Sequence, residues 1–367
     1  MQRVVIRADA SLRSGTGHIM RCLVLANELK QLGFQIHFIS CEVPGNLCAQ
    51  LVQCGYPVHQ LSYLQTLDLD NYDQSGSTEL WQKDLDQTRE ILRRFEGQTQ
   101  WIIVDNYKLD EKWESGIRSF VNKVMVIDDL ADRKHDCDVL LDQNLFWNLE
   151  QRYAGLIPGH CQTLFGPKFA LLRPEFSTAR RTLKKRDGII KSILVFYGGT
   201  DPTGETIKTL EVITVLKDQR FRDLIVDVVV GEGNLYRQQL HKMCDMISNT
   251  NFHCQINYMA DLMSKADLAL GAGGSVTWER CSLALPAIVT ITAKNQLETS
   301  RYIASLGAIR CLGWHENVTG QKLAKALTEL IDNPQEVLEM SQKAGSLIVG
   351  KFSEKGDPLI EIFLENE

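Results

Sequence analysis

The chain has 367 residues, of which 44% are hydrophobic and 23% are charged, and its formal net charge is −6 at pH 7. This length exceeds that of one ordinary domain, so two domains are expected, and the composition is that of a globular protein. Tight binding to nucleic acid requires many lysines and arginines on one face, so the acidic balance argues against a nucleic-acid partner.

The N-terminal sequence and the cysteines indicate the compartment. Only three apolar residues separate Arg3 from Arg7, which is too short for the apolar core of a signal peptide. No later run approaches the roughly 18 apolar residues of a membrane span. Ten cysteines lie scattered without a Cys-x-x-Cys pair, which is typical of reduced, buried thiols. We expect a cytoplasmic, monomeric protein without a membrane span.

The first half of the chain predicts alternating strands and helices. A helical period covers residues 19–32, residues 62–77 are polar and predict a loop, and a further helix ends near residue 95. The expected strands are residues 3–8, 35–40, 101–105, 123–127 and 139–141.

A second series follows the basic run at residues 180–186, which is interpreted as a solvated linker. Alternation of this kind predicts two doubly wound parallel sheets, in an N-terminal domain at 1–178 and a C-terminal domain at 187–367. The expected strands of the second domain are residues 192–197, 224–230, 252–256, 267–270 and 287–291.

Polar or glycine-rich segments follow most of these strands. Because ligands bind outside the carboxyl ends of parallel strands, we expect the segments to converge on one crevice. They are residues 15–18, 105–107, 128–129, 198–201, 271–275 and 294–296.

The segment Gly15-Thr16-Gly17-His18 joins a strand to a helix. Glycines admit an oxygen-rich ligand, and a helix N-terminus disfavours the charged imidazolium, so His18 is a candidate general base. The alternative is a hydrogen-bonded structural histidine. Arg21 lies one turn later, where it meets either the same anion or a surface carboxylate.

Two further turns predict phosphate binding. Consecutive glycine N–H groups in residues 271–275, followed by a helix, form a cradle, and Glu279 is placed to accept hydrogen bonds from a ribose diol. The alternative for Glu279 is a favourable charge near a helix N-terminus. In the turn at residues 198–201, Asp201 is either a ligand or a helix start.

Three Asp-x-Asp triplets occur, at residues 68–70, 84–86 and 136–138. Such pairs hold a divalent ion in some sugar-transferring enzymes. With 46 acidic residues they also arise by chance, and only the last one adjoins a predicted strand. We expect no metal site.

Taken together, these segments resemble the UDP-2,4-diacetamido-2,4,6-trideoxy-β-L-altropyranose hydrolases of pseudaminic acid biosynthesis. The resemblance spans roughly residues 1–310 and is weakest in residues 42–100. The segments occur in the family's order: 7–11, 15–21, 104–107, 128–129, 141–144, 166–176, the turns at 198 and 271, and 294–296.

The resemblance implies a GT-B fold related to the MurG-type glycosyltransferases, with two Rossmann-like domains facing a central cleft and UDP held by the C-terminal one. It implies hydrolysis of a UDP-sugar with inversion, without metal or cofactor, with His18 as catalytic base and Tyr107 and Asn295 beside the reacting sugar. The implied substrate contacts are Asp9, Gly15, Gly17, Arg21, Gly198, Gly199, Asp201, Thr206, Gly273, Gly274, Ser275, Thr277, Glu279 and Gln296.

Two other functions remain open. A GT-B glycosyltransferase would use the same nucleotide site and pass the sugar to an acceptor hydroxyl, whereas a non-catalytic nucleotide-sugar sensor would leave His18 idle. UDP release without an acceptor separates the first from hydrolysis, and turnover by the purified protein excludes the second.

Overall fold

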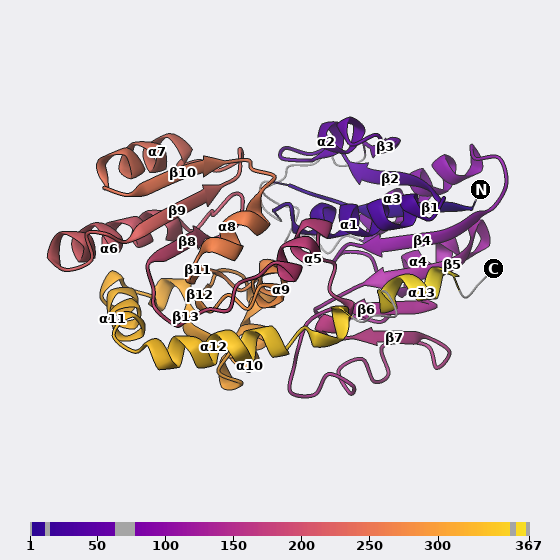
Figure 1. Ribbon diagram of the computed structural model, residues 1–367. Coiled ribbons are helices and arrows are strands. Elements are labelled where there is room, and N and C mark those ends of the chain that lie inside the picture. The colour runs from indigo at the N-terminus through magenta and orange to yellow at the C-terminus, as the bar shows by residue number, and fades with distance from the viewer. Residues whose placement is uncertain (1, 12–14, 63–77, 353–356, 365–367) are drawn as a thin grey trace. The chain divides into compact units, whose positions relative to one another are not determined.

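A computed structural model describes residues 2–11, 15–62, 78–352 and 357–364. The chain forms two compact units, each with its own parallel sheet (Figure 1). The first unit contains residues 1–144, 148–171 and 355–367, and the second contains residues 145–147 and 172–354.

The sheet of the first unit has seven strands within the described residues, in the order β3-β2-β1-β4-β5-β6-β7, and neighbouring strands are parallel. The strand order reverses at β1, from which the chain first winds toward β3 and later returns to β4. The strands are β1 Arg3–Ala8, β2 Gln35–Cys41, β3 Val58–Leu61, β4 Thr99–Asp105, β5 Val121–Ile127, β6 Val139–Asp142 and β7 Gln162–Phe165.

Apolar side chains cover both faces of this sheet, as expected for parallel strands buried between helices. In β1, Val4 and Ile6 join a core with helix α1, while Val5 points into the core that contains α3 and α4. The helices are α1 Gly17–Gln31, α2 Cys48–Gln53, α3 Thr78–Arg93 and α4 Glu111–Ile117.

The last helix, α13 (Pro358–Leu364), belongs to the first unit although it ends the described chain. Phe363 is buried, and its ring centroid lies 4.9 Å from that of Trp101 and 6.4 Å from that of Phe34. This core is therefore built from both ends of the sequence.

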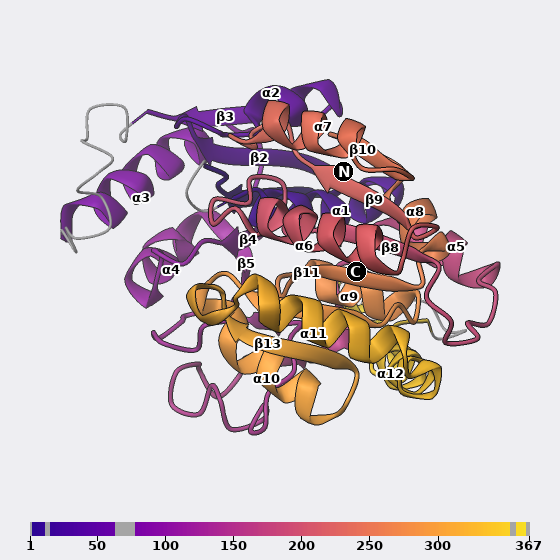
Figure 2. The same ribbon diagram turned by 90° about the vertical axis from the view of Figure 1, so that its left-hand side faces the viewer.

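The sheet of the second unit has the order β10-β9-β8-β11-β12-β13 within the described residues and is also parallel. Helices α6 and α11 lie side by side along it (Figure 2). Its strands are β8 Ser192–Phe196, β9 Ile225–Val230, β10 Thr250–Cys254, β11 Leu268–Ala272, β12 Ala287–Ile291 and β13 Ile309–Trp314. Its helices are α5 Pro174–Arg181, α6 Glu205–Gln219, α7 Arg237–Met246, α8 Met259–Lys265, α9 Val276–Ser282, α10 Leu297–Ser305, α11 Gly320–Ile331 and α12 Pro334–Ser346.

The predicted strands are confirmed within a few residues at their ends, but β3, β7 and β13 were not predicted. All three lie at sheet edges. The observed division of the chain also differs from the expected one: the main crossing to the second unit is at Leu172, and residues 355–367 return to the first.

The interpretation of the basic run as a solvated linker holds for Arg181, Lys184 and Lys185, which are exposed, but not for Arg180 and Arg186. Arg180 lies in α5 and donates to the backbone carbonyl of Ser282. Burial lowers the pKa of Arg186 to about 10, because its acceptors are uncharged backbone carbonyls of the α8 and α9 ends, on Met263, Ala266, Leu283 and Ala284.

Six of the ten cysteines are buried, and all ten are free thiols, as expected. Among the helices that the structure describes, none has the length and apolar character needed to cross a membrane.

We expect Phe363→Ala to lower the free energy of unfolding by about 3–5 kcal/mol, because it empties a site between α13 and the sheet. Equilibrium unfolding in urea measures the change. Leu364→Ala is the matched control, since that side chain is 44% exposed. Equal effects of the two substitutions would contradict the packing described for α13.

Candidate active site

Both units place glycine-rich turns where the strand order reverses, between β1 and β4 in the first and between β8 and β11 in the second. Such a switch point opens a crevice at the carboxyl ends of the strands. His18 follows β1 and Asp105 ends β4, whereas Gly198 follows β8 and Gly273 follows β11. The two groups of predicted residues therefore lie at equivalent positions of two similar sheets.

The turn before α1 presents His18. Gly15 adopts a φ of 74°, a conformation that favours glycine, and its N–H donates to the carbonyl of Ser11 at 2.9 Å. His18 lies in the first turn of α1, and its Nδ1 is 2.5 Å from Oδ1 of Asp105. Among the described residues, no hydrogen bond is formed at Nε2. The ring is thus held by one nitrogen only.

Asp105 is buried and binds a second partner, Arg21, whose Nε and Nη2 donate to its two oxygens at 2.6 Å each. Burial raises the pKa of the Asp105 carboxyl, but Arg21 and His18 outweigh burial and hold that pKa well below its usual range. An ionised carboxylate only accepts hydrogen bonds, so Nδ1 of His18 carries a proton. In the neutral ring, Nε2 then keeps the lone pair that a general base needs.

The contact between His18 and Asp105 was not predicted from the sequence. Asp105 was noted only as a polar residue at a strand end. The two residues are 87 positions apart, and nothing short of the strand order indicated their contact.

Tyr107 lies against His18, with ring centroids 4.5 Å apart and planes at 80°. Its hydroxyl donates to Oδ1 of Asp129 at 2.5 Å. Burial and the charge of Asp129 raise the pKa of Tyr107 well above its usual range, so the phenol stays neutral. Asp129 also accepts from Arg21 at 3.2 Å. Arg21 therefore connects Asp105, which binds His18, to Asp129, which binds Tyr107.

Two predicted substrate ligands are engaged with the protein itself. Asp9 accepts from Arg7 at 2.6 and 2.8 Å, from the N–H of Cys41 at 2.7 Å and from Asn106 at 2.8 Å. It thereby ties the end of β1 to β2 and to the segment after β4. The partners of Arg21 are the buried carboxylates of Asp105 and Asp129, not a surface carboxylate. Substrate contacts of Asp9 and Arg21 remain predictions.

In the second unit, Asp201 is buried and caps α6. Its Oδ1 accepts from the N–H of Glu205 at 3.1 Å and its Oδ2 from the N–H of Thr206 at 2.8 Å. The helix itself begins at Glu205 after the N-cap residue Gly204, so Asp201 binds its first N–H groups from outside the helix, and a ligand contact of Asp201 stays a prediction. Thr206 is buried, and its hydroxyl has no partner within the described part of the chain. Gly198 and Gly199 precede this cap, and a Cβ at Gly198 would meet no atom within 4 Å.

The loop after β11 requires glycine for a packing reason. A Cβ at Gly273 would overlap the hydroxyl oxygen of Ser300. The N–H of Gly273 donates to Oε1 of Gln296 at 3.3 Å, and the same oxygen accepts from the N–H of Thr292 at 3.0 Å. Gln296 thus fixes the loop against the end of β12. Gly274 follows, with ordinary space for a Cβ.

Ser275 is the N-cap residue of α9, and its side chain makes no capping hydrogen bond. Thr277 is buried and accepts from Arg280 at 3.0 Å, which indicates a structural role for its hydroxyl. Glu279 lies in the first turn of α9, where its Oε1 accepts from Nε of Arg173 at 2.9 Å. Asn295 is half-buried in a short 3-10 helix at Lys294–Gln296.

The candidate metal-binding triplets have other partners or lie outside the described residues. Arg118 binds Asp136 at 2.9 Å and Asp138 at 2.6 Å, and Asp84 pairs with Arg7. The triplet at residues 68–70 lies outside the described residues. Within the described ranges, no three histidine, cysteine, aspartate or glutamate side chains are grouped to hold a metal.

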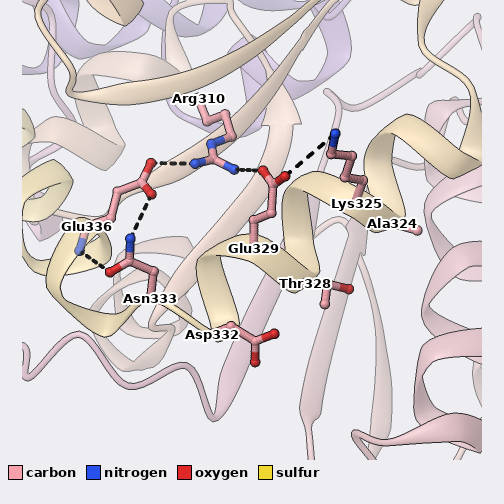
Figure 3. A pocket seen from close by; sticks show the side chains of 8 residues that line it. All are labelled: Arg310, Ala324, Lys325, Thr328, Glu329, Asp332, Asn333 and Glu336. Atoms are coloured by element: carbon pink, nitrogen blue, oxygen red, sulfur yellow. Dashed lines mark hydrogen bonds and ion pairs between the residues drawn. The ribbon is translucent and has the colours of Figure 1, made fainter.

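A groove of about 610 Å³ beside α11 and α12 is lined mostly by charged side chains (Figure 3). Arg310 lies between Glu329, at 2.8 Å, and Glu336, and Lys325 also approaches Glu329. These charges neutralise one another. The residues that line the groove belong to β13, α11, α12 and the segment between the two helices, not to the turns after β8 and β11. We therefore do not assign the candidate site to it.

Comparison with known proteins supports the fold and part of the chemistry. Residues 193–355 match the glycosyltransferase family 28 C-terminal domain. The crystal structure of Acinetobacter baumannii MurG superposes with a TM-score of 0.61 at 16% identity, covering 94% of this chain and 95% of MurG. The expected GT-B fold class is confirmed.

Two relatives match most of the chain. One is the UDP-2,4-diacetamido-2,4,6-trideoxy-beta-L-altropyranose hydrolase of Campylobacter jejuni, 25% identical over 312 residues, which are 83% of this chain and 97% of that protein. The other is an uncharacterized protein of Methanocaldococcus jannaschii, 24% identical over 82% of this chain. The match covers 57% of the length of the archaeal protein.

The first unit contains a further buried acid close to Asp129. Asp142, at the end of β6, is fully buried and lies 3.0 Å from the hydroxyl of Tyr153, which also contacts Asp128 at 3.1 Å. One phenolic proton cannot serve both carboxylates. Burial and the charge of Asp129 raise the pKa of Asp142 to about 7, so the folded protein holds a proton on this acid below that pH.

We expect this group to make unfolding depend on pH. Between pH about 4 and about 7 the folded state binds more protons at Asp142 than the unfolded state, so stability falls as pH rises through this window. Asp142→Asn, which mimics the protonated acid, should flatten that slope. Urea unfolding at several pH values measures it, and an unchanged slope would contradict the assignment.

Proposed function

We propose that this chain hydrolyses the anomeric C–O bond of a UDP-activated diacetamido-trideoxy sugar, releasing UDP and the free sugar with inversion, as in pseudaminic acid biosynthesis. The observation that carries the proposal is the contact between His18 and Asp105, which leaves Nε2 of His18 as a base. The similarity to the hydrolase of Campylobacter jejuni along 97% of its length supports the choice of substrate.

The chemistry assigned to His18 is proton abstraction from water. As the water oxygen bonds to the anomeric carbon, Nε2 takes the proton, and the C1–O bond breaks with its electron pair leaving on UDP. Asp105 stabilises the resulting imidazolium, as the aspartate of a catalytic triad does. UDP is a good leaving group, so N–H dipoles that meet its charge replace a strong general acid. The step requires neither a metal nor a cofactor.

The second unit is assigned the nucleotide. Its match to the family 28 C-terminal domain and its two glycine-rich turns at the β8–β11 switch point support UDP binding there. In this assignment Glu279 accepts from the ribose, and Asn295 and Gln296 lie toward the sugar. The Asp201 carboxylate accepts from two N–H groups of α6 and cannot donate to a phosphate, so the N–H groups of Gly198 and Gly199 are assigned as the phosphate donors.

Sugar transfer to an acceptor hydroxyl is the second candidate, because the matching domain family is one of glycosyltransferases. A deprotonated acceptor would then take the place of the deprotonated water at His18. Release of UDP from the sugar nucleotide in the absence of any acceptor supports hydrolysis, and strict dependence on an acceptor supports transfer.

The bond that breaks is tested in ¹⁸O-labelled water. Attack at carbon places the label on the C1 hydroxyl of the sugar and none on UDP, and the first-formed anomer has the configuration opposite to that of the substrate. Mass spectrometry of both products and early NMR spectra report these outcomes. Label in a nucleotide product would indicate attack at phosphorus, which normally recruits divalent ions.

We expect His18→Asn to lower turnover by at least about 100-fold, the usual contribution of a general base. Asp105→Asn should lower it by a similar factor, because a carboxamide no longer fixes the proton on Nδ1 or stabilises the imidazolium. UDP binding, measured by calorimetry, should persist in both variants. Near-normal turnover in the His18 variant would refute its assignment as the base.

A further inference from the structure

Arg173 is held in one orientation by three neighbours. Its Nε donates to Glu279 at 2.9 Å, its Nη1 lies 3.1 Å from Glu175, and its guanidinium carbon lies 5.0 Å from the ring centroid of the buried Phe176. An arginine stacked on an aromatic ring and bonded to two carboxylates has lost most of its rotamer freedom. It is therefore a fixed point to which another side chain can be tied.

The side chain tied to it is that of Glu279. This carboxylate is partly buried, with 17% of the side chain exposed, and Arg173 engages its Oε1 through a single N–H. A carboxylate offers about four acceptor positions. One hydrogen bond from Arg173 therefore fixes the group while leaving acceptor positions for a second donor.

Arg173 keeps its positive charge at ordinary pH. Burial lowers the pKa of Arg173, but Glu279 and Glu175 outweigh burial and raise it above its usual value. The remaining acceptor positions of Glu279 are therefore presented in one direction, without the rotamer entropy that an unpaired glutamate loses on binding.

We infer that Arg173 is a positioning residue for nucleotide recognition: it orients Glu279 toward a vicinal diol, and so gives the second unit a preference for a ribonucleotide. The inference rests on the proposed binding of UDP. Arg173 does not touch the nucleotide in this account, and its effect reaches the ligand only through the carboxylate it holds. Its removal should weaken the binding of nucleotides that carry the diol and spare those that lack it.

The test compares UDP with 2′,3′-dideoxy-UDP by isothermal titration calorimetry on the full chain. Arg173→Gln should raise the Kd for UDP about tenfold and that for the dideoxy nucleotide less than about twofold. In a Glu279→Gln background, Arg173→Gln should cause no further loss, because the two residues act as one unit. Arg173→Lys keeps the charge but not the Nε–H, and should show the same selective loss.

Arg180→Gln is the matched control. Arg180 also connects α5 to the end of α9, through the carbonyl of Ser282, but does not contact Glu279. It should leave the preference for UDP over the dideoxy nucleotide unchanged, with thermal unfolding confirming that each variant is folded. Equal weakening of both nucleotides by Arg173→Gln, or no weakening, would overturn the inference. Failure of the wild-type chain to bind UDP would instead overturn the proposed function.

Discussion

The chemistry assigned to the first unit depends on one buried negative charge, that of Asp105. A carboxylate removed from water is costly unless cations and hydrogen bonds compensate it, and here Arg21 and His18 do so. The compensation fixes three things together: the register of α1 against β4, the proton on Nδ1, and the orientation of Nε2. A sheet that places two strand ends side by side is what makes this pair of residues available.

In the second unit, polar side chains mainly stabilise turns. There, two side chains that the sequence suggested as ligands also stabilise turns: Asp201 accepts from N–H groups of α6, and Gln296 fixes the Gly273 loop. Such turns present backbone N–H groups in a set geometry, which suits an anion whose charge is spread over many oxygens. A side chain that shapes a turn and one that touches the ligand have the same sequence signature, because both must lie at the end of a strand.

Much of the architecture was predictable because buried parallel strands are continuous apolar runs, and strands such as β8 and β12 were located well. The three strands not predicted are edge strands, in which exposure removes that signal: β7, for example, has Gln and Thr exposed at two of its four positions. The motifs placed His18, Tyr107, Asp105 and Asp129 near one crevice, but they did not predict that Asp105 binds His18 or that Asp129 binds Tyr107. Those contacts join residues that only the strand order brings together, and local spacing carries no information about them.

The position of α13 has a consequence for biosynthesis. Domains generally fold as units while the ribosome is still at work, the N-terminal one first. Here the hydrophobic cluster around Trp101 and Phe34 lacks Phe363 until α13 has been synthesised, so part of its apolar surface stays uncovered while the second unit is made. A polypeptide cut short anywhere before α13 therefore leaves part of this apolar surface exposed to solvent.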